Sequence, residues 1–545
     1  TIQLENINKI HSELLLNKEL FIEKIEDGLK AKSINCWPNV DFDFGSIIQF
    51  FHKLVPAGFY YKTFMWPNWH LFEPSIRKAA GLAAAPHKPP SKGHFESRNA
   101  HTDILVIGSG PAGLAAALIA AKTGAKVFLV DQNSEPGGDL LSSNLRVNKR
   151  PAMAWVDGVV SELAKMTNVT HMQNSTAWAY REHNLVIVNQ REVDNSSIIE
   201  RSWRVRAKKV IIATGAIERS LVFANNDRPG VMLASAVHTF VNRYAVKVGD
   251  NLVLFTNNDS VYDYIDALGK AGINILAIID SRKIIPDQCL SRSKKIKVIA
   301  NSMIKNVNGY KQVKSIVVQS LDTGKFETIS CDLLAHSGGW NPAVHLHSQS
   351  RGSLRFSEKI VAFVPDKNIQ NSLSIGACNG TFGLAEIFKE TEQVMSEISD
   401  EFKSVSQTTN LEIEDQHYSI EPLWSTDLSN EKESAFFDIQ NDVTYDDVQL
   451  ALLEGYSNVE HVKRYTTGGM GFDQGKTGNI NIIGSIANQQ GVPLDSIGTT
   501  TFRSPFTPVS FGSINGVRQG NVVLPFRHTP VTKWNLEKGA FMYEA

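Results

Sequence analysis

The chain contains 545 residues, of which 42% are hydrophobic and 20% are charged, as is typical of soluble globular proteins. A chain of this length predicts roughly three or four domains rather than a single core. Its formal net charge of −1 argues against a nucleic-acid partner and against binding to a membrane surface.

The beginning of the chain predicts a helix over residues 1 to about 30, where apolar residues recur among Glu and Lys. An aromatic-rich segment follows, and its density of aromatic side chains favours a packing surface over a ligand site. Residues 83–101 are rich in proline and polar residues, which indicates a linker. We therefore predict a first unit over residues 1–95. No charged segment followed by an apolar core opens the chain, so no secretory signal is expected.

The cysteines are too scattered for a metal site, because none falls in a C-x-x-C pair or in a Cys/His cluster with zinc spacing. Reduced and mostly buried thiols in a cytoplasmic protein are expected from this pattern. The longest apolar stretch, residues 104–121, contains glycines and a proline, which favour a buried strand–turn–helix over a membrane span. The four cysteines are Cys36, Cys289, Cys331 and Cys378.

From about residue 102 to residue 390 the predicted strands and helices alternate, which indicates a parallel sheet covered by helices and an α/β fold class. A largely helical module is predicted over residues 430–495. Residues 496–545, rich in Thr, Pro and Gly, predict an extended segment.

A dinucleotide site is the strongest signal in the chain. Glycines with G-x-G-x-x-G spacing follow a buried strand over residues 103–107 and open a helix. The first permits a tight turn, the second lets the backbone approach a pyrophosphate, and the third lets helix and strand pack closely. Asp131 ends the next strand, about twenty residues further on, where an acid binds the ribose hydroxyls. Because Gln132 rather than a basic residue follows, NAD is favoured over NADP.

Three further segments resemble signatures of the glutathione-reductase class of flavoproteins, which have two dinucleotide domains: "EPGGDLL", "KKVIIATGAIER" and "SLSIGACNGTFG". With them, the residues predicted to bind NAD are Gly108, Gly110, Pro111, Ala112, Gly113, Asp131, Gln132, Gly138, Asp139, Ala213, Thr214, Gly215 and Gly376.

A second nucleotide half is predicted over residues 245–330, inserted in the first. Its turn carries Thr256, Asn257, Asn258 and Asp259 where glycines are expected, and their side chains would block a pyrophosphate. We predict that this site is structurally retained but empty. A disulfide reductase is excluded because no cysteine pair follows the first glycine loop.

The loop "GGMGFDQGKTGN" ends like a phosphate-binding Walker loop. However, its first glycine is out of register and the preceding "VEHVKRYTT" predicts a helix, so a nucleoside triphosphatase is unfavoured. His345 and His347 alternate like a metal pair but have no third ligand in view, so a structural role is favoured and no metal is predicted. No Ser/His/Asp or paired-carboxylate set is apparent, and the catalytic residues stay unknown.

Several phrases resemble the alpha subunit of heterotetrameric sarcosine oxidase, from about residue 28 onwards. Examples are "LVPAGFYYKTFMWP", "ERSLVFANNDRPGVMLASA", "SGGWNPAVHLHSQ", "FDIQNDVTYDDVQLA" and "GTTTFRSPFTPV". The resemblance implies assembly with beta, gamma and delta subunits, with NAD in the alpha subunit. It also implies FAD on the beta subunit, FMN attached to beta at the alpha–beta boundary, and a folate-binding domain at the C-terminal end of alpha.

The sequence departs from that pattern at both ends. It does not contain most of the ferredoxin-like domain that the resemblance implies before the aromatic segment, and "TPVTKWNLEKGAFMYEA" resembles only the first turn of the folate domain. Either the sequence is a fragment, or its folate chemistry resides elsewhere. Folate is therefore expected as a partner only if that domain is present.

The helical module resembles one that holds a two-iron cluster in related opine and proline dehydrogenases. The matching places carry Asp438, Gln440, Asp473 and Gly478 instead of cysteines, so no iron–sulfur cluster is expected. Since the resemblance places FMN near this module, we expect contacts to it from Arg464, Thr466, Gln474, Gly475, Lys476 and Thr477.

The leading hypothesis is therefore an oxidoreductase subunit that serves the demethylation of sarcosine. A subunit of a related amine, opine or imino-acid dehydrogenase is an alternative, as is an NAD-bound scaffold without chemistry of its own.

Overall fold

The computed structural model describes most of the chain from residue 94 onwards. The described residues are 2–6, 29–33, 38–39, 42–45, 47, 64, 66–79, 94–191, 197–401, 411–413, 416–428, 433–471, 474–515 and 529–540. No helix within these ranges is long and apolar enough to cross a membrane.

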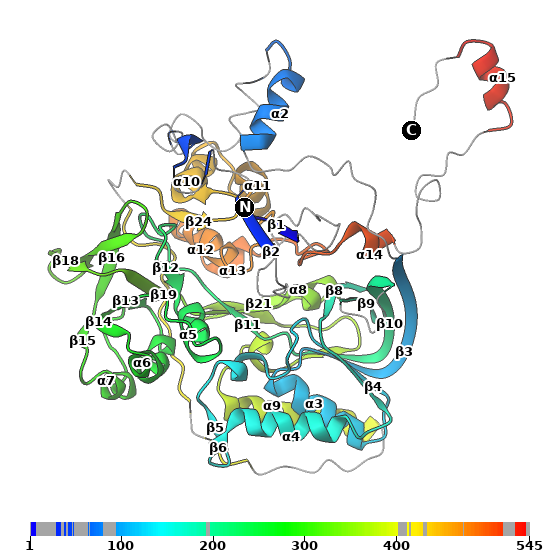
Figure 1. Ribbon diagram of the computed structural model, residues 1–545, viewed down its shortest axis with the longest axis horizontal. Helices are drawn as coiled ribbons and strands as arrows, with labels where there is room; N and C mark the ends of the chain where they lie inside the picture. Colours follow the sequence, from blue (N-terminus) through cyan, green and yellow to red (C-terminus); the bar gives the residue numbers. More distant parts are fainter. Residues whose placement is uncertain are drawn as a thin grey trace.

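The first nucleotide half is a seven-stranded sheet in which the strands that carry the glycine turn are parallel and the outer hairpin is antiparallel. Three helices, α3 (Pro111–Lys122), α4 (Ala152–Leu163) and α9 (Leu384–Glu401), pack together below it in Figure 1. They share a buried core with the sheet through residues such as Ile104, Leu129 and Ile211. The strands, in spatial order, are β7 (Val169–Met172), β4 (Val127–Val130), β3 (His94–Ile107), β10 (Ile198–Ile212), β9 (Leu185–Gln190) and β8 (Ser175–Arg181), with β23 (Ser372–Ser374) beside β10.

The second nucleotide half is a five-stranded parallel sheet, on the left in Figure 1. The strand order is β12 (Val231–Leu233), β19 (Leu333–Ser337), β13 (Asn251–Thr256), β14 (Asn274–Asp280) and β15 (Lys297–Ile299). One face carries α5 (Ala234–Asn242), α6 (Ser260–Lys270) and α7 (Asp287–Arg292). The other face packs against an antiparallel sheet of β16 (Ser302–Gly309), β17 (Val313–Ser320) and β18 (Phe326–Ser330).

Two short strands, β11 (Ala216–Glu218) and β20 (Trp340–Pro342), form an antiparallel ribbon where the chain passes between the two halves. The short helix α8 (His345–Gln349) and the hairpin β21 (Leu354–Ser357)–β22 (Ala362–Pro365) follow it. The ribbon is therefore the part of the fold that both halves share.

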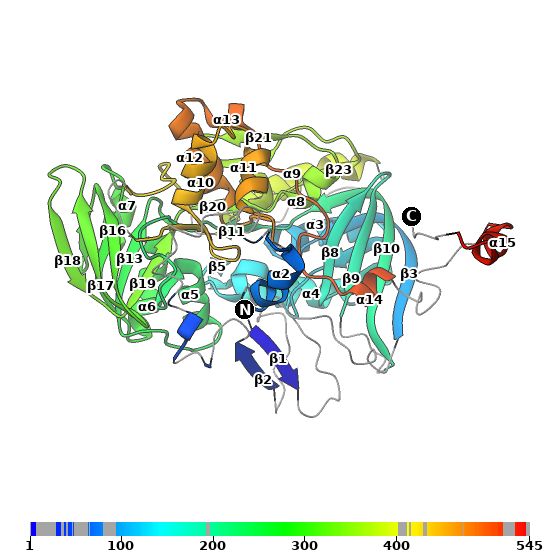
Figure 2. The same ribbon diagram turned by 90° about the horizontal axis from the view of Figure 1, so that it is seen from above.

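The helical module lies on the side of the molecule opposite α3, α4 and α9 in Figure 1, and Figure 2 shows the same molecule from above, with the module in front of them. Thr444 and Asp447 form a reciprocal capping box that fixes the start of its first helix. The module core includes Val222 from the first half, so the module packs directly onto the chain that leaves the ribbon. Its elements are β24 (Phe436–Asp438), β25 (Val443–Thr444), α10 (Tyr445–Leu453), α11 (Val459–Thr466), α12 (Asn479–Gln490) and α13 (Leu494–Ile497).

The α/β fold class is confirmed, and three local predictions are wrong. Residues 2–6 form β1 (Ile2–Asn6), paired with β2 (Leu29–Ser33), although a helix was expected there; residues 7–28 lie outside the described ranges. Residues 94–101 belong to β3 rather than to a linker, because they pair with β10. The C-terminal extended segment contains the short helices α14 (Phe511–Asn515) and α15 (Thr532–Glu537).

Candidate functional site

The first glycine turn is shaped by backbone contacts that allow no side chain. A Cβ atom on Gly108, whose φ is +106°, would lie 2.2 Å from the carbonyl oxygen of Ala213. One on Gly113 would lie 1.8 Å from the carbonyl oxygen of Gly108. Gly110 differs, because its nearest neighbour would be Cα of Gly138 at 3.9 Å. Two glycines thus serve the fold, whereas a Cβ atom on Gly110 would make only an ordinary van der Waals contact, so the fold does not require a glycine there.

Helix α3 begins at this turn without a side-chain cap. Gly110 is its N-cap residue and supplies no side-chain acceptor, while Pro111 occupies the first turn. The free N–H groups of such a helix start favour a phosphate. Ala112 is buried, and a Cβ on Gly376 would come within 2.8 Å of its methyl group, so Gly376 closes the turn from the side of β23.

Asp131 stands at the end of β4 and points back to the turn. Its carboxylate accepts hydrogen bonds from the backbone N–H of Ser109 at 2.5 Å and from the Ser109 hydroxyl at 2.9 Å. The side chain is 7% exposed. The carboxylate therefore lies at the position expected for an acid that binds ribose. Gln132 is exposed, and its carbonyl oxygen accepts a hydrogen bond from Arg191, a nearby cation that the sequence pattern did not predict.

The strand end at residues 213–215 ties this turn to the ribbon. The Thr214 hydroxyl donates to the carbonyl oxygen of Ala343 at 2.8 Å, and the Ala343 N–H donates to Gly215. Gly215 has φ +73°, and a Cβ atom on it would meet no other atom within 4 Å, so it also faces open space. The turn at Gly138 and Asp139 lies beside the glycine turn, because a Cβ atom on Gly138 would lie 3.0 Å from Cα of Gly110. The region that these residues border, the predicted nucleotide site, is called the first cleft.

The far wall of that cleft comes from α5 of the second half. Asn242 donates to the carbonyl oxygen of Ser142 at 2.8 Å, and its amide lies 2.8 Å from Nε2 of His238. Burial lowers the pKa of His238 to about 4, so the imidazole is neutral near pH 7.

Glu218 is a buried acid that sequence reasoning missed, although it follows the "ATGAI" strand end directly. Its Oε2 accepts from the backbone N–H of Ser235 at the start of α5, and the side chain is 2% exposed. Burial raises the pKa of Glu218 to about 7, and the nearby charge of Asp139 adds to that rise. A carboxyl that changes charge near neutral pH therefore lies beside the cleft.

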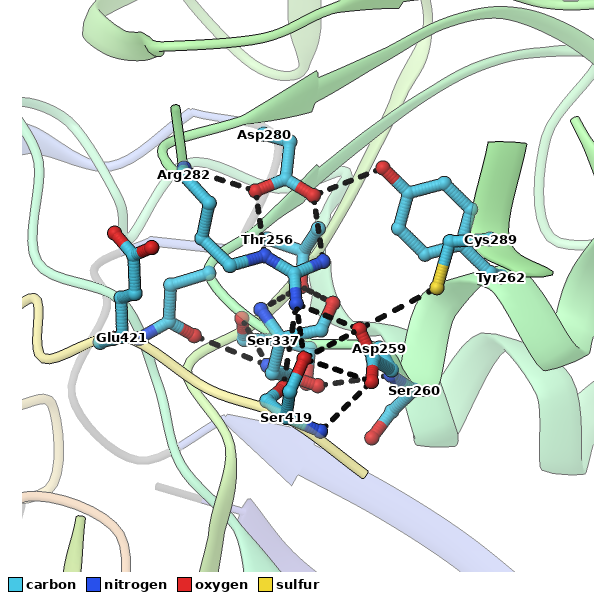
Figure 3. A network of polar contacts seen from close by, with 12 residues as sticks. Thr256, Asp259, Ser260, Tyr262, Asp280, Arg282, Cys289, Ser337, Ser419 and Glu421 are labelled. Carbon is cyan, nitrogen blue, oxygen red and sulfur yellow. Dashed lines mark hydrogen bonds and ion pairs between the residues drawn. The ribbon is translucent and has the colours of Figure 1, made fainter. Parts of the chain in front are cut away.

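The second nucleotide turn is filled by its own side chains (Figure 3). Arg282 lies between two carboxylates: Nη1 donates to Asp259 at 2.6 Å, and Nε and Nη2 donate to Asp280 at 3.0 and 2.8 Å. The Tyr262 hydroxyl also donates to Asp280 at 2.8 Å. Asp280 ends β14 just as Asp131 ends β4, so the acid that could bind a ribose is instead paired with an arginine.

Residues 416–428, the connecting segment, run across the mouth of this second turn. The backbone N–H of Ser419 donates to Asp259 at 2.7 Å, and Asn257 donates to the carbonyl oxygen of Glu421 at 2.6 Å. Burial opposes ionisation of Asp259, but hydrogen bonds and charge from Arg282 outweigh it and lower the pKa of this carboxyl. The geometry supports the prediction of a retained half whose nucleotide site is closed.

The loop that resembles a Walker loop connects α11 to α12, so the predicted helix before it is confirmed. Gly475 has φ +73°, and a Cβ there would lie 2.1 Å from the Asn479 side chain. Lys476 and Thr477 lie just before the start of α12, and the Lys476 ammonium lies 5.4 Å from the ring centre of Phe506. The loop thus carries an ammonium and a hydroxyl on successive residues just before a helix start.

The side chains of two other residues expected to contact FMN form hydrogen bonds within the chain. The Thr466 hydroxyl donates to the carbonyl oxygen of Val462 and accepts from Gly468, and the residue is 2% exposed. The Gln474 amide donates to the carbonyl oxygen of Gly471. Arg464 is exposed on α11. Lys476, Thr477 and Arg464 are therefore better placed for a ligand than Thr466.

The places that resemble cluster ligands come together in space without thiols. Asp438 accepts hydrogen bonds from the backbone of Gln440 and Gly469, and a Cβ on Gly478 would lie 3.9 Å from Cα of Asp438. Asp473 lies outside the described residues. A carboxylate therefore organises the turn between β24 and β25.

The histidine pair and the described cysteines form no metal site. His347 lies 2.9 Å from the carbonyl oxygen of Ser353, while His345 is packed between Phe502 and Phe506. Within the described ranges, no three His, Cys, Asp or Glu side chains are grouped as metal ligands. Cys289, Cys331 and Cys378 are free and buried; Cys36 lies outside those ranges.

Comparison with known proteins relates this geometry to a family. Residues 102–251 match the model described as pyridine nucleotide-disulphide oxidoreductase, and residues 432–517 match the sarcosine oxidase A3 domain. Sarcosine oxidase subunit alpha of Rhizobium meliloti (strain 1021) is 39% identical over 541 residues, which cover 97% of this chain and 54% of that protein. The chain is a homologue of sarcosine oxidase alpha subunits.

A second relative agrees with this assignment, and a solved structure shares the fold. Sarcosine oxidase subunit alpha of Corynebacterium sp. (strain P-1) is 37% identical over 470 residues, covering 82% of this chain and 48% of that protein. This chain therefore spans about half the length of these curated relatives. The L-proline dehydrogenase of P. horikoshii superposes with a TM-score of 0.61 at 20% identity, covering 78% of this chain and 82% of that one, and supports the fold.

The buried carboxyl of Glu218 predicts a pH-dependent stability. Its folded pKa of about 7 exceeds the ordinary value, so the folded state holds the proton more tightly than the unfolded state. Stability is then lost as pH rises from about 4.5 to 7, by about 3 kcal/mol. Glu218→Gln should remove this loss, so the difference in unfolding free energy between variant and wild type should grow over that pH range. Parallel curves, or an equal effect of the exposed control Glu182→Gln, would contradict the assignment.

The closed second turn predicts a large dependence on Arg282. Arg282→Met leaves two buried carboxylates without their cation and should cost about 3–5 kcal/mol in urea unfolding. The matched control is Lys270→Met, because Lys270 pairs with Asp266 on the exposed face of α6 at 2.6 Å. That change should cost less than about 1 kcal/mol. Similar costs for the two variants would show that the network does not stabilise the second half.

Proposed function

We propose that this chain acts as the alpha subunit of a multi-subunit sarcosine oxidase. In this role it binds NAD in the first cleft and contributes to an FMN site at the interface with a beta subunit, which carries FAD. The complete assembly, with gamma and delta subunits, converts sarcosine, oxygen and water to glycine, formaldehyde and hydrogen peroxide. With tetrahydrofolate bound by a folate domain, methylene-tetrahydrofolate would replace formaldehyde. The observation that carries the proposal is the 39% identity to an alpha subunit over 97% of the chain.

The first cleft suits NAD in three respects. Gly110 leaves room for the pyrophosphate, the uncapped start of α3 offers N–H groups, and Asp131 lies where a ribose would bind. The Asp131 carboxylate would repel a 2′-phosphate, and Arg191 already donates to a backbone carbonyl. NAD, when bound, supplies a nicotinamide that can accept or donate hydride, and this chain's residues hold and orient it.

Nucleotide extraction tests this cleft. The denatured wild-type chain should release about one NAD, identified by mass, and Gly110→Ala should release at least about tenfold less because a methyl group fills the approach of the pyrophosphate. Since no atom lies within 3.9 Å of that methyl position, the variant should fold normally. The control Gly158→Ala, which meets no atom within 4 Å in α4, should keep its nucleotide. Stoichiometric FAD or NADP in the wild type, or full NAD in Gly110→Ala, would overturn the assignment.

The loop at residues 474–478 suits a phosphate dianion. Lys476 supplies an ammonium and Thr477 a hydroxyl just before the start of α12. FMN, when bound, supplies the redox-active ring, and this loop would hold its phosphate or ribityl chain from the alpha side. Gln474 belongs to the loop itself, and Arg464 lies on the preceding helix α11.

Assembly with the partner subunits tests the function and the loop together. The isolated chain should not oxidise sarcosine, whereas the assembled complex should form peroxide. Lys476→Ala should lower FMN content relative to FAD in that complex, because loosening of the phosphate contact costs about 2–5 kcal/mol. The FAD of the beta subunit serves as an internal control for assembly. Sarcosine oxidation by the isolated chain, or a wild-type ratio of FMN to FAD in Lys476→Ala, would refute these roles.

Two other functions make different predictions. A related amine, opine or imino-acid dehydrogenase subunit would support oxidation of those amines by the assembled complex in place of sarcosine. An NAD-bound scaffold would leave the activity of the partner subunits unchanged when it is omitted. The copurifying subunits and their preferred amine distinguish these cases.

A further inference from the structure

Arg219 is a buried cation that no described carboxylate neutralises. Its side chain is 0% exposed, and it donates from Nε to the side-chain oxygen of Asn341 at 3.0 Å and from Nη2 to the carbonyl oxygen of Val361 at 2.7 Å. Nη1 has no hydrogen-bond partner among the described residues. The guanidinium lies 5.5 Å from the ring centre of Trp424, which adds a cation–π contact. A buried charge with only neutral partners is costly, which indicates a role beyond packing.

Asn341 connects this cation to the loop at residues 474–478. Its Oδ1 accepts from Arg219, and its Nδ2 donates to the carbonyl oxygen of Lys476 at 3.1 Å. Because each end of the amide has its own partner, the two bonds together fix the orientation of Asn341. Asn341 belongs to β20, a strand of the ribbon that also borders the first cleft. The bond therefore holds the backbone of the loop at Lys476 against a rigid part of the nucleotide half.

The surroundings of the loop carry further positive charge. Lys463 on α11 is buried, and its pKa is lowered by burial and by the nearby Arg503 and Arg464. Glu460 is the acid beside Lys463 and acts in the opposite sense. Burial also lowers the pKa of His345, to about 3, and the charge of Lys476 contributes to that shift. His345 is thus neutral, and Lys463, Arg464 and Arg503 add positive charge on the α11 side of the loop, while Asp438 and Glu460 are acids nearby.

We infer that Arg219 and Asn341 are positioning residues for a phosphate dianion at the loop of residues 474–478. Arg219 orients Asn341, and Asn341 fixes the carbonyl of Lys476, so that the N–H groups and the ammonium of the loop are held ready for the anion. Arg219 also adds a positive field from a site that water does not reach. This inference rests on the proposed function, which places the FMN phosphate at the same loop.

The substitution Asn341→Asp keeps the hydrogen bond to Arg219 and removes the one to Lys476. The new carboxylate still accepts a hydrogen bond from Arg219, and its negative charge attracts the guanidinium. However, the carboxylate cannot donate to the carbonyl oxygen of Lys476 and would repel that oxygen. The chain should therefore fold with equal or higher thermal stability, while FMN per FAD in the assembled complex should fall by about tenfold. Asn341→Ala removes both bonds without adding charge and should lower the same ratio. The control is Asn308→Asp, because Asn308 is exposed on β16 and donates to Ser315. This substitution should leave the ratio unchanged.

The outcomes distinguish this inference from the proposed function. A wild-type ratio of FMN to FAD in both Asn341 variants, together with FMN loss in Lys476→Ala, would overturn the inference alone. Retention of FMN in Lys476→Ala as well would refute the phosphate site itself. Equal loss of FMN and FAD in both Asn341 variants would show that Asn341 supports assembly, and this would also overturn a positioning role.

Discussion

The fold depends on the contact between three backbones at the first glycine turn. Gly108 lies against the carbonyl of Ala213, and Gly113 lies against the carbonyl of Gly108, at distances that exclude any Cβ atom. This contact brings the ends of β3 and β10 together with the start of α3. Because parallel strands end at the same edge of the sheet, Asp131 and Thr214 then reach the same cleft without further adjustment. Gly110 is less constrained, because a Cβ atom there would make only an ordinary van der Waals contact with Cα of Gly138.

The two nucleotide halves repeat one strand–turn–helix plan with opposite outcomes. In the first half the turn is open and its acid faces Ser109; in the second half Asp259, Arg282 and Asp280 form a buried network. Desolvation of three charges is expensive, but each here has several hydrogen bonds, which is the condition under which such a network persists. The filled turn anchors the connecting segment at Ser419, ahead of the helical module.

Periodicity and motif spacing predicted the parts of the structure that are local in sequence. The glycine turn, the strand that ends at Asp131, the side chains that fill the second turn and helix α11 all follow from patterns shorter than about thirty residues. The early part of β3 was missed because its stability comes from pairing with β10, about a hundred residues away. Residues 2–6 were missed for the same reason, since their partner is residues 29–33. Glu218 and Arg191 acquire their significance from burial and proximity, which no local pattern encodes.

The ribbon of β11 and β20 explains how one short stretch can serve two sites. Successive side chains of a strand point to opposite faces, and Glu218 and Arg219 are neighbours at its end. Glu218 turns toward the start of α5 and the first cleft, whereas Arg219 turns toward Asn341, Trp424 and the helical module. The backbone N–H of Arg219 continues the ladder by donating to the carbonyl of Gly339, which fixes the backbone from which both side chains project. Glu218, whose pKa is raised to about 7, and the buried guanidinium of Arg219 therefore project to opposite sides of the same strand end. Only the strand end at Glu218 and Arg219 and the side-chain amide of Asn341 therefore lie between the titrating carboxyl of Glu218 and the loop at Lys476.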